Sequence, residues 1–323
     1  MITVIIWCVI LKLIPVYSER YDEASCLGDK DVFGKRLGED MILGELYFHL
    51  YSKEWFHTPL NLTSNNIRLL NGTLDTKIII PGWTEQSYEE WVISMKNAYL
   101  SKQPFNIIVF DWGQYTYYPY EMVPDIVKTC GKYLGDFLIL LYRENVIDLD
   151  KVHVIAHSVG AHIAGLAGKH VQKHLAKNVF RISALNAAGP KYEEALPADR
   201  LFRNDAKIVD GYHAHDGVFG MRRAYGTVDF FLSQKDPQLL KCLIPPEISC
   251  YSIYIWIRCR HRDTFDLWLR SIIWGNLTAI GIVRKDRILI GEQCPQAARG
   301  IYNHIVDIKP ALYFRRAECL GRY

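Results

Sequence analysis

The stretch Val154-Ile155-Ala156-His157-Ser158-Val159-Gly160-Ala161-His162 is the most informative part of this chain. A β-branched run stops at a small residue, and a serine follows, then a glycine and small residues typical of a helix. This order predicts a nucleophile elbow, the strained strand-to-helix turn that exposes a reactive serine above a sheet. Ser158 is therefore the candidate nucleophile. The usual pattern is G-x-S-x-G, and Ala156 stands at the first glycine position.

Strand-like runs alternate with helical ones on both sides of this turn. Short apolar runs predict strands, and apolar residues at three- and four-residue spacings predict helices. We expect strands over 78–80, 105–111, 152–155, 180–185 and 207–213, and helices over 125–145 and 163–174. This β-α-β rhythm predicts a mostly parallel central sheet with helices on both faces. Together with the elbow it predicts an α/β-hydrolase fold, in which Gly165 and Gly168 let a helix approach the sheet closely.

Length and composition fit one large domain. The chain has 323 residues, half of them hydrophobic, and a formal net charge of +3, which is too small to indicate a nucleic-acid partner. Residues 1–18 form an apolar segment with a Val-x-Ser cleavage pattern. We expect a signal peptide over 1–18, a single domain over 19–323 and secretion to the extracellular space. Lys12 interrupts the apolar run, and an N-terminal anchor is the alternative.

Cysteines and glycosylation sequons agree with secretion. Of the eight cysteines, seven remain once Cys8 is removed with the leader, so one is free or pairs between chains. No C-x-x-C pair occurs, so no metal site is expected, and disulfides are the default in an oxidising compartment. Sequons for N-glycosylation begin at Asn61, Asn71 and Asn276.

A serine hydrolase also needs a histidine that takes the serine proton and a carboxylate that orients the histidine. In α/β-hydrolases the acid and then the histidine follow the serine along the chain. Two later segments occupy these places. Leu185-Asn186-Ala187-Ala188-Gly189-Pro190 follows a predicted strand, and Cys259-Arg260-His261-Arg262 precedes a helical run. Asn186 therefore stands at the acid position, and His261 is the candidate general base.

These segments resemble motifs of the animal pancreatic-lipase-like family. The family elbow reads G-H-S-L-G-A-H, its acid motif L-D-P-A-G-P and its histidine motif C-S-H-x-R. Further matches lie between about residues 48 and 314: residues 209–214 are similar to the strand V-D-V-I-H-T, 226–231 to the loop G-H-x-D-F-Y, and 110–112 to the turn V-D-W. The chain is most similar to compact insect members, the phospholipase A1 enzymes and their non-catalytic yolk-protein relatives.

The resemblance implies oxyanion donors in the backbone N–H groups of Trp83 and Val159. Three positions depart from the family pattern: Asn186 replaces the acid, Ala156 the first elbow glycine, and Pro81 the histidine of H-G-F/W. An Asp-to-Asn change in the equivalent role of a serine protease costs ~10⁴-fold in turnover, because the amide favours the wrong histidine tautomer. Two outcomes are open for Ala156: its methyl group crowds the turn, or alanine is tolerated there as in some hydrolases.

Asp216 is a possible substitute acid, because it follows the strand expected next in the sheet after the one that ends at Asn186. The alternative is an ordinary turn residue, which the pair Asp216-Gly217 favours.

The family carries a disulfide-tethered lid over the region that corresponds to 242–259, and the resemblance implies a short apolar lid here. A strand packed on the core is the alternative, because the run is nearly all apolar. The candidate lid residues are Cys242, Cys250, Trp256 and Cys259. Cys250 leaves the lid pairing open between Cys242–Cys259 and Cys242–Cys250, and we further expect the pairs Cys26–Cys130 and Cys294–Cys319.

Four other histidines are expected to be structural. His157 and His162 flank the serine and are interpreted as hydrogen-bonded packing residues, which leaves His261 as the base. His213 and His215 are interpreted as structural rather than catalytic or metal-binding.

Two functions remain open on these grounds. The first is a secreted carboxylic-ester hydrolase of phospholipid or acylglycerol. The second is a catalytically inactive homologue that binds lipid, another apolar ligand or a protein partner. A lipid partner at a membrane or lipid-droplet interface is expected in either case, and no cofactor is implied. The family's larger lipases carry a C-terminal lipid-binding β-sandwich, for which this chain is too short, so no colipase partner is expected.

Overall fold

The computed structural model describes residues 46–306, apart from 117, 119, 215–218, 235–264, 266, 274, 276 and 284. The expected signal peptide over 1–18 lies outside the described residues, as do the candidate lid over 242–259 and both Asp216 and His261.

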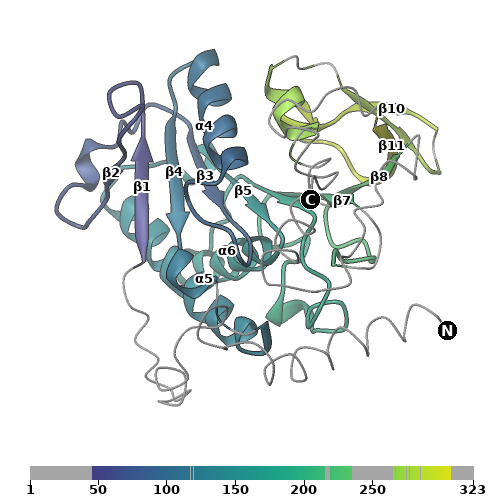
Figure 1. Cartoon of the computed structure of the whole chain (residues 1–323), viewed down its shortest axis with the longest axis horizontal. Coiled ribbons are helices and arrows are strands. Elements are labelled where there is room, and N and C mark those ends of the chain that lie inside the picture. Colours follow the sequence, from purple (N-terminus) through teal and green to yellow (C-terminus); the bar gives the residue numbers. More distant parts are fainter. Residues whose placement is uncertain are drawn as a thin grey trace, which may run out of the picture.

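Within the described residues, 11 strands form one sheet. They are β1 (Tyr47–Tyr51), β2 (Leu60–Asn61), β3 (Thr76–Ile80), β4 (Asn106–Asp111), β5 (Val152–His157), β6 (Arg181–Leu185), β7 (Ile208–Ala214), β8 (Val228–Gln234), β9 (Thr278–Gly281), β10 (Arg287–Leu289) and β11 (Gly300–Val306). Their order is β10-β9-β11-β8-β7-β6-β5-β3-β4-β1-β2 (Figure 1). The strands from β11 to β4 pair in parallel, and antiparallel pairs occur at the two edges. The predicted, mostly parallel sheet is confirmed.

Helices cover both faces of the sheet, as predicted. Helix α4 (Glu90–Lys102) lies on one side of the strands, and α5 (Val123–Arg143) and α6 (Val159–Leu175) lie on the other (Figure 1). Successive strand residues point to opposite faces. Ile78 and Ile80 accordingly pack in the core with α5 and α6, whereas Ile79 packs in the core with α4. The two apolar cores explain why the central strands read as continuous hydrophobic runs.

Two expectations about local structure are wrong. Gly165 and Gly168 face the segment 201–205 rather than the sheet, since a Cβ on Gly168 would lie 2.1 Å from the backbone oxygen of Asp205. Residues 226–231 do not form a loop throughout, because β8 begins at Val228 and pairs in parallel with β7 and β11. The contact of Gly168 with Asp205 and the pairing of β8 with β7 and β11 join segments that are far apart in the sequence, so no local pattern indicates them.

Cys130 and Cys294 are buried, and no disulfide joins either of them to another described residue. Their expected partners, Cys26 and Cys319, lie outside the described residues, so both pairings stay predictions. Cys130 lies on the buried face of α5, where burial raises the pKa of its thiol. Burial raises the pKa of the Cys294 thiol to about 12. Both sulfur atoms therefore act as small apolar groups of the core.

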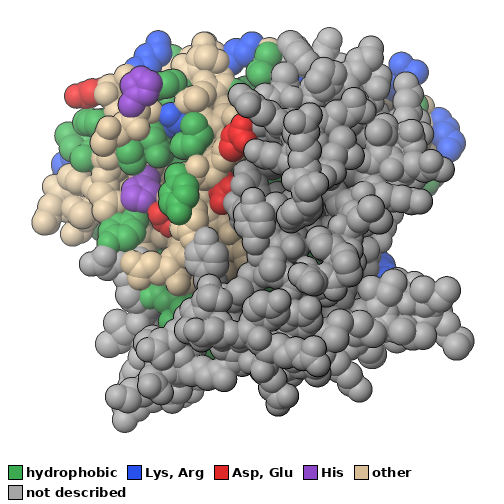
Figure 2. Space-filling model, viewed as in Figure 1, with side chains coloured by type: hydrophobic (Ala, Val, Ile, Leu, Met, Phe, Trp, Pro, Cys, Tyr) green, Lys and Arg blue, Asp and Glu red, His purple; other side chains and the backbone are tan. Residues whose placement is uncertain are grey.

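Charged side chains of both signs are scattered among hydrophobic ones on the face shown in Figure 2, in keeping with the small net charge. Among the described residues, no helix combines the length and the apolar character that a membrane crossing needs.

Candidate active site

Ser158 occupies the turn between β5 and α6, where the sequence predicts an elbow. Its backbone has φ 51° and ψ −118°, a conformation that residues with a Cβ rarely adopt. Such a residue costs about 1–3 kcal/mol and persists only where its surroundings fix it. Here the Ser158 N–H donates to the Leu185 oxygen at 3.1 Å, and the Ser158 oxygen accepts from Ala161 N–H at 3.2 Å. The strained strand-turn-helix geometry is therefore present.

Glycine is required at only one of the two positions that flank the elbow. A Cβ on Gly160 would lie 2.5 Å from the Pro81 oxygen and 2.8 Å from the Ile80 oxygen, both of which are backbone atoms. Ala156, in contrast, lies inside β5 with ordinary strand geometry, opposite Ile80 on one side and Ala184 on the other. Its methyl group is fully buried in the core. Alanine is therefore tolerated at this position, and its methyl group does not crowd the turn.

Two backbone N–H groups lie on the chain segments that meet at the serine. A Cβ on Gly82 would lie 3.0 Å from the Cβ of Ser158, so the loop of Trp83 is next to the elbow. The Val159 N–H belongs to the first turn of α6, where N–H groups lack a partner in the helix and the helix dipole favours negative charge. Among the described residues neither the Trp83 nor the Val159 backbone N–H has an acceptor. Both retain the hydrogen-bonding capacity that an oxyanion needs.

The loop keeps its anchors without the histidine that Pro81 replaces. The Pro81 oxygen accepts from Nε1 of Trp112 at 2.9 Å. Nε1 of Trp83 donates to the Tyr118 oxygen at 2.9 Å. Because these bonds use backbone oxygens and indole nitrogens, the loop does not depend on a side chain at position 81.

Asn186 lies beside Ser158 at the carboxyl edge of the sheet. His157 and Leu185 are opposite each other at the ends of β5 and β6. Ser158 directly follows His157, and Asn186 directly follows Leu185. The next strand, β7, pairs in parallel with β6, as expected for the strand that precedes Asp216. Topology therefore places the acid position next to the nucleophile.

The Asn186 side chain is held tightly in place. It is 3% exposed, and its Oδ1 accepts from Ala214 N–H at 3.0 Å. Its backbone has φ 53°, and its N–H donates to the Tyr212 oxygen at 2.7 Å. A Cβ on Gly220 would lie 2.2 Å from Oδ1 of Asn186, so only glycine fits against this side chain.

His157 and His162 have the structural role predicted for them. Nδ1 of His157 lies 2.8 Å from Oε2 of Glu85. Nε2 of His162 lies 2.8 Å from the Ala188 oxygen, and its Nδ1 accepts from Leu201 N–H at 3.1 Å. Burial lowers the pKa of each imidazole to about 3. At these pKa values both rings are neutral at pH 7.

The neutral buried histidines predict an acid-sensitive fold. A folded-state pKa of about 3 is below the usual 6.5, so the unfolded chain binds these protons first. Stability is therefore highest above pH 6.5 and is lost as the pH falls toward 3. We expect each histidine to lower the free energy of unfolding by about 2 kcal/mol between pH 7 and pH 5. Urea unfolding measures the free energy of unfolding at each pH. Between pH 7 and pH 5 this free energy should fall by about 2 kcal/mol less in His162→Gln than in the wild type. An equal fall in both proteins would contradict the prediction.

His213 is also structural. Its Nδ1 lies 2.9 Å from the Met221 oxygen, and its Nε2 lies 2.8 Å from Oδ1 of Asp229. The imidazole stacks on Phe231, with ring centroids 4.2 Å apart. His215 lies outside the described residues.

Phe265, which follows the predicted base His261 in the sequence, lies beside the elbow. Phe265 lies four residues after His261 in the sequence. Its buried ring packs edge-on against His157, with centroids 4.5 Å apart, and stacks on Trp91 at 4.5 Å. Phe265 is therefore packed against the residue that precedes the nucleophile.

Two of the three predicted glycosylation sites are accessible. Asn61, on the edge strand β2, and Asn71, in a loop, are both exposed. Oδ1 of Asn71 accepts from the N–H and the hydroxyl of Thr73 at 3.0 and 2.7 Å. Asn276 lies outside the described residues, and glycan attachment stays a prediction.

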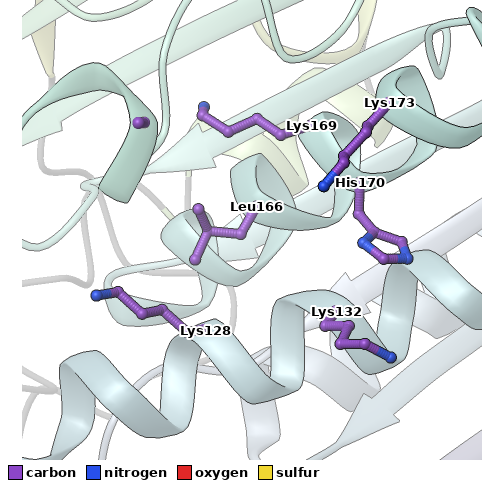
Figure 3. Close-up of a pocket in the computed structure, with 7 residues that line it drawn as sticks. Lys128, Lys132, Leu166, Lys169, His170 and Lys173 are labelled. Atoms are coloured by element: carbon purple, nitrogen blue, oxygen red, sulfur yellow. The ribbon is translucent and has the colours of Figure 1, made fainter.

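A cationic groove lies elsewhere, between α5 and α6 (Figure 3). Its lining residues are Lys128, Lys132, Leu166, Lys169, His170, Lys173 and Ala198. Three of the lysines are paired: Lys132 with Asp136 at 2.6 Å, Lys128 with Asp199 at 3.5 Å, and Lys169 with Asp205. The groove contains none of the predicted site residues, and its positive charge is largely compensated.

Glu85 is the site residue that the sequence analysis missed. It lies three residues after Gly82 and contacts His157, which is 72 residues away along the chain. Only the meeting of β3 and β5 in the sheet brings these residues together, so no spacing rule could indicate the contact.

The fold and the elbow define an α/β-hydrolase. A sequence model of the Lipase family matches residues 55–272, and the chain belongs to that family. It is 29% identical over 216 residues to lipoprotein lipase of Gallus gallus, covering 63% of this chain and 43% of that protein. It is 29% identical over 225 residues to hepatic triacylglycerol lipase of Mus musculus, covering 65% and 43%.

Pancreatic triacylglycerol lipase of Myocastor coypus is 28% identical over 225 residues, covering 65% of this chain and 48% of that protein. These matches confirm the predicted similarity to the animal pancreatic-lipase-like family. The chain spans less than half the length of these relatives. The closer similarity to the compact insect members stays a prediction.

Proposed function

We propose that this chain is a secreted carboxylic-ester hydrolase that acts on phospholipid or acylglycerol. The observation that carries the proposal is the backbone of Ser158, held at φ 51° between β5 and α6. A serine in this turn presents its Oγ above the sheet. The adjacent N–H groups of Trp83 and Val159 support an oxyanion site. Membership of the Lipase family and the lipase names of its relatives support the substrate class.

In the proposed reaction, Ser158 Oγ attacks the ester carbonyl carbon while His261 takes the hydroxyl proton. The N–H groups of Trp83 and Val159 bind the oxyanion that forms. Collapse of this intermediate breaks the ester C–O bond, and His261 gives the proton to the leaving alcohol. Water then attacks the acyl-enzyme with His261 as base, which releases the fatty acid and restores Ser158.

Asn186 lacks the carboxylate that would orient His261 in this reaction. Its Oδ1 accepts the Ala214 N–H, and the rest of the amide is the Nδ2 donor. A donor that faces Nδ1 of His261 would favour the tautomer with the proton on Nε2, which cannot accept a proton from serine. We therefore expect low turnover unless Asp216 serves as the acid instead.

The amide of Asn186 at the predicted acid position favours a second candidate, a catalytically inactive homologue that binds lipid, another apolar ligand or a protein partner. A family member that keeps its elbow and changes its acid retains the fold but has little capacity for the chemistry. In that case the ligand is bound at a membrane or lipid-droplet interface and released unchanged.

The test is hydrolysis of phosphatidylcholine vesicles, tributyrin and a short-chain nitrophenyl ester by secreted, purified protein. We expect release of fatty acid from the wild type, no release from Ser158→Ala, and unchanged release from Ser101→Ala, an exposed serine on α4. Equal background from wild type and Ser158→Ala would contradict the hydrolase and favour the binding protein.

A further inference from the structure

One carboxylate oxygen contacts both segments that carry the candidate oxyanion donors. Oε2 of Glu85 accepts from Gly82 N–H at 2.5 Å and lies 2.8 Å from Nδ1 of His157. Gly82 precedes Trp83, and His157 precedes Ser158. Glu85 therefore joins the loop after β3 to the elbow after β5.

The backbone of Glu85 fixes the peptide group that bears the Trp83 N–H. Its own N–H donates to the Gly82 oxygen at 3.3 Å. In a trans peptide the carbonyl and the following N–H point in opposite directions. The bond to the Gly82 oxygen therefore sets the direction of the Trp83 N–H, while the side-chain bond to Gly82 N–H holds the preceding peptide.

The surroundings leave this arrangement little freedom. Glu85 is 2% exposed and His157 is 1% exposed, so water does not compete for these bonds. A Cβ on Gly82 would lie 3.0 Å from Nδ1 of His157, 3.0 Å from Cβ of Ser158 and 3.1 Å from Oε2 of Glu85. Thr84, at φ 64°, is tied to the Thr116 oxygen through its N–H at 3.0 Å.

We propose that Glu85 is a positioning residue: its carboxylate clamps the Pro81–Gly82 peptide to His157 of the elbow, and this holds the following Gly82–Trp83 peptide so that the Trp83 N–H points at the oxyanion. The inference rests on the proposed ester hydrolysis. Glu85 touches neither substrate nor reacting atoms, and it acts on the transition state through the oxyanion donor alone.

The principal variant is Glu85→Leu, which removes the acceptor and keeps most of the volume. Loss of one oxyanion donor typically costs 10²–10³-fold in turnover. We expect kcat to fall about 10²-fold with KM changed by less than about threefold, because the donor acts mainly in the transition state. Glu85→Gln keeps an oxygen acceptor and should restore kcat to within about tenfold of the wild type. The inhibition constant of a boronic-acid analogue should rise in proportion to the loss of kcat/KM.

A matched control is Asp205→Asn. Asp205 is 3% exposed, accepts from the Phe202 N–H at 2.8 Å and pairs with Lys169, and it lies against Gly165 and Gly168 of α6. The Asp205→Asn variant should have a lower melting temperature than the wild type. Its kcat per titrated active site and its inhibition constant for the boronic-acid analogue should be unchanged. If Glu85→Leu behaves like Asp205→Asn, Glu85 is merely structural and the proposal is overturned.

Amide hydrogen exchange over residues 80–86 provides a readout that does not need activity. Glu85→Leu should exchange at least about tenfold faster there than the wild type, and Asp205→Asn should not. If neither the wild type nor Asn186→Asp hydrolyses ester or reacts with a fluorophosphonate, the proposed function fails, and exchange alone decides whether Glu85 holds the loop. Unchanged exchange overturns the inference in every case. If Glu85→Leu does not fold, Glu85→Asp replaces it, since it keeps the charge but withdraws the oxygens by one methylene.

Discussion

Asn186→Asp is expected to raise kcat for ester hydrolysis by about 10³- to 10⁴-fold, the reverse of the loss seen when a triad aspartate becomes asparagine. One carboxylate oxygen can accept the Ala214 N–H, as Oδ1 of Asn186 does at 3.0 Å. In the proposed reaction the other oxygen would accept Nδ1–H of His261, which favours the tautomer that can take the serine proton. Because Asp and Asn have the same shape, the contact with Gly220 is kept.

The measurement is kcat on a nitrophenyl ester per active site titrated with a fluorophosphonate. Asn65→Asp, at an exposed position, adds the same charge away from the site and should change nothing. A weakly active wild type that Asn186→Asp leaves unchanged and Asp216→Ala inactivates would show that Asp216 is the acid. No gain in Asn186→Asp together with no loss in Asp216→Ala would remove both residues from the mechanism.

Arg181→Met is expected to lower the free energy of unfolding by about 3–5 kcal/mol, because it leaves a buried carboxylate without its partner. Nε and Nη2 of Arg181 donate to the two oxygens of Asp210 at 3.0 and 2.6 Å. Asp210 is 0% exposed. Arg181 also donates to the backbone oxygens of Gly291 and Glu292 at 2.8 and 3.2 Å, so it ties the turn that contains these two residues to β6.

Urea unfolding monitored by tryptophan fluorescence measures this loss. The control is Arg68→Met, whose ion pair with Glu144 at 2.7 Å is exposed and should contribute only about 0–1 kcal/mol. The double variant Arg181→Met/Asp210→Leu should be more stable than Arg181→Met alone, since the unpaired charge is gone. A loss in Arg181→Met no larger than in Arg68→Met would show that the buried pair contributes no more than a surface pair.

Most of the sheet could be predicted from local pattern. The runs 78–80, 105–111 and 152–155 became β3, β4 and β5, because residues buried on both faces must be apolar at every position. The strands β9 and β10 at one end of the sheet were not predicted, since they are short and at least half of the residues of each are exposed. The burial of Cys130 and Cys294 in the apolar core could not be predicted, because sequence spacing does not reveal where a cysteine side chain packs.

The sequence by itself determined the elbow, because a strand, a serine and a small-residue helix are contiguous and their conformations follow from local sterics and hydrophobic pattern. It also predicted that Asn186 stands at the acid position, since chain order is preserved in this fold. Only the tertiary structure decided that Ala156 is harmless in a strand while Gly160 is required against the end of β3. It alone brought Glu85 to His157, because hydrogen bonds between segments 72 residues apart depend on which strands become neighbours in the sheet.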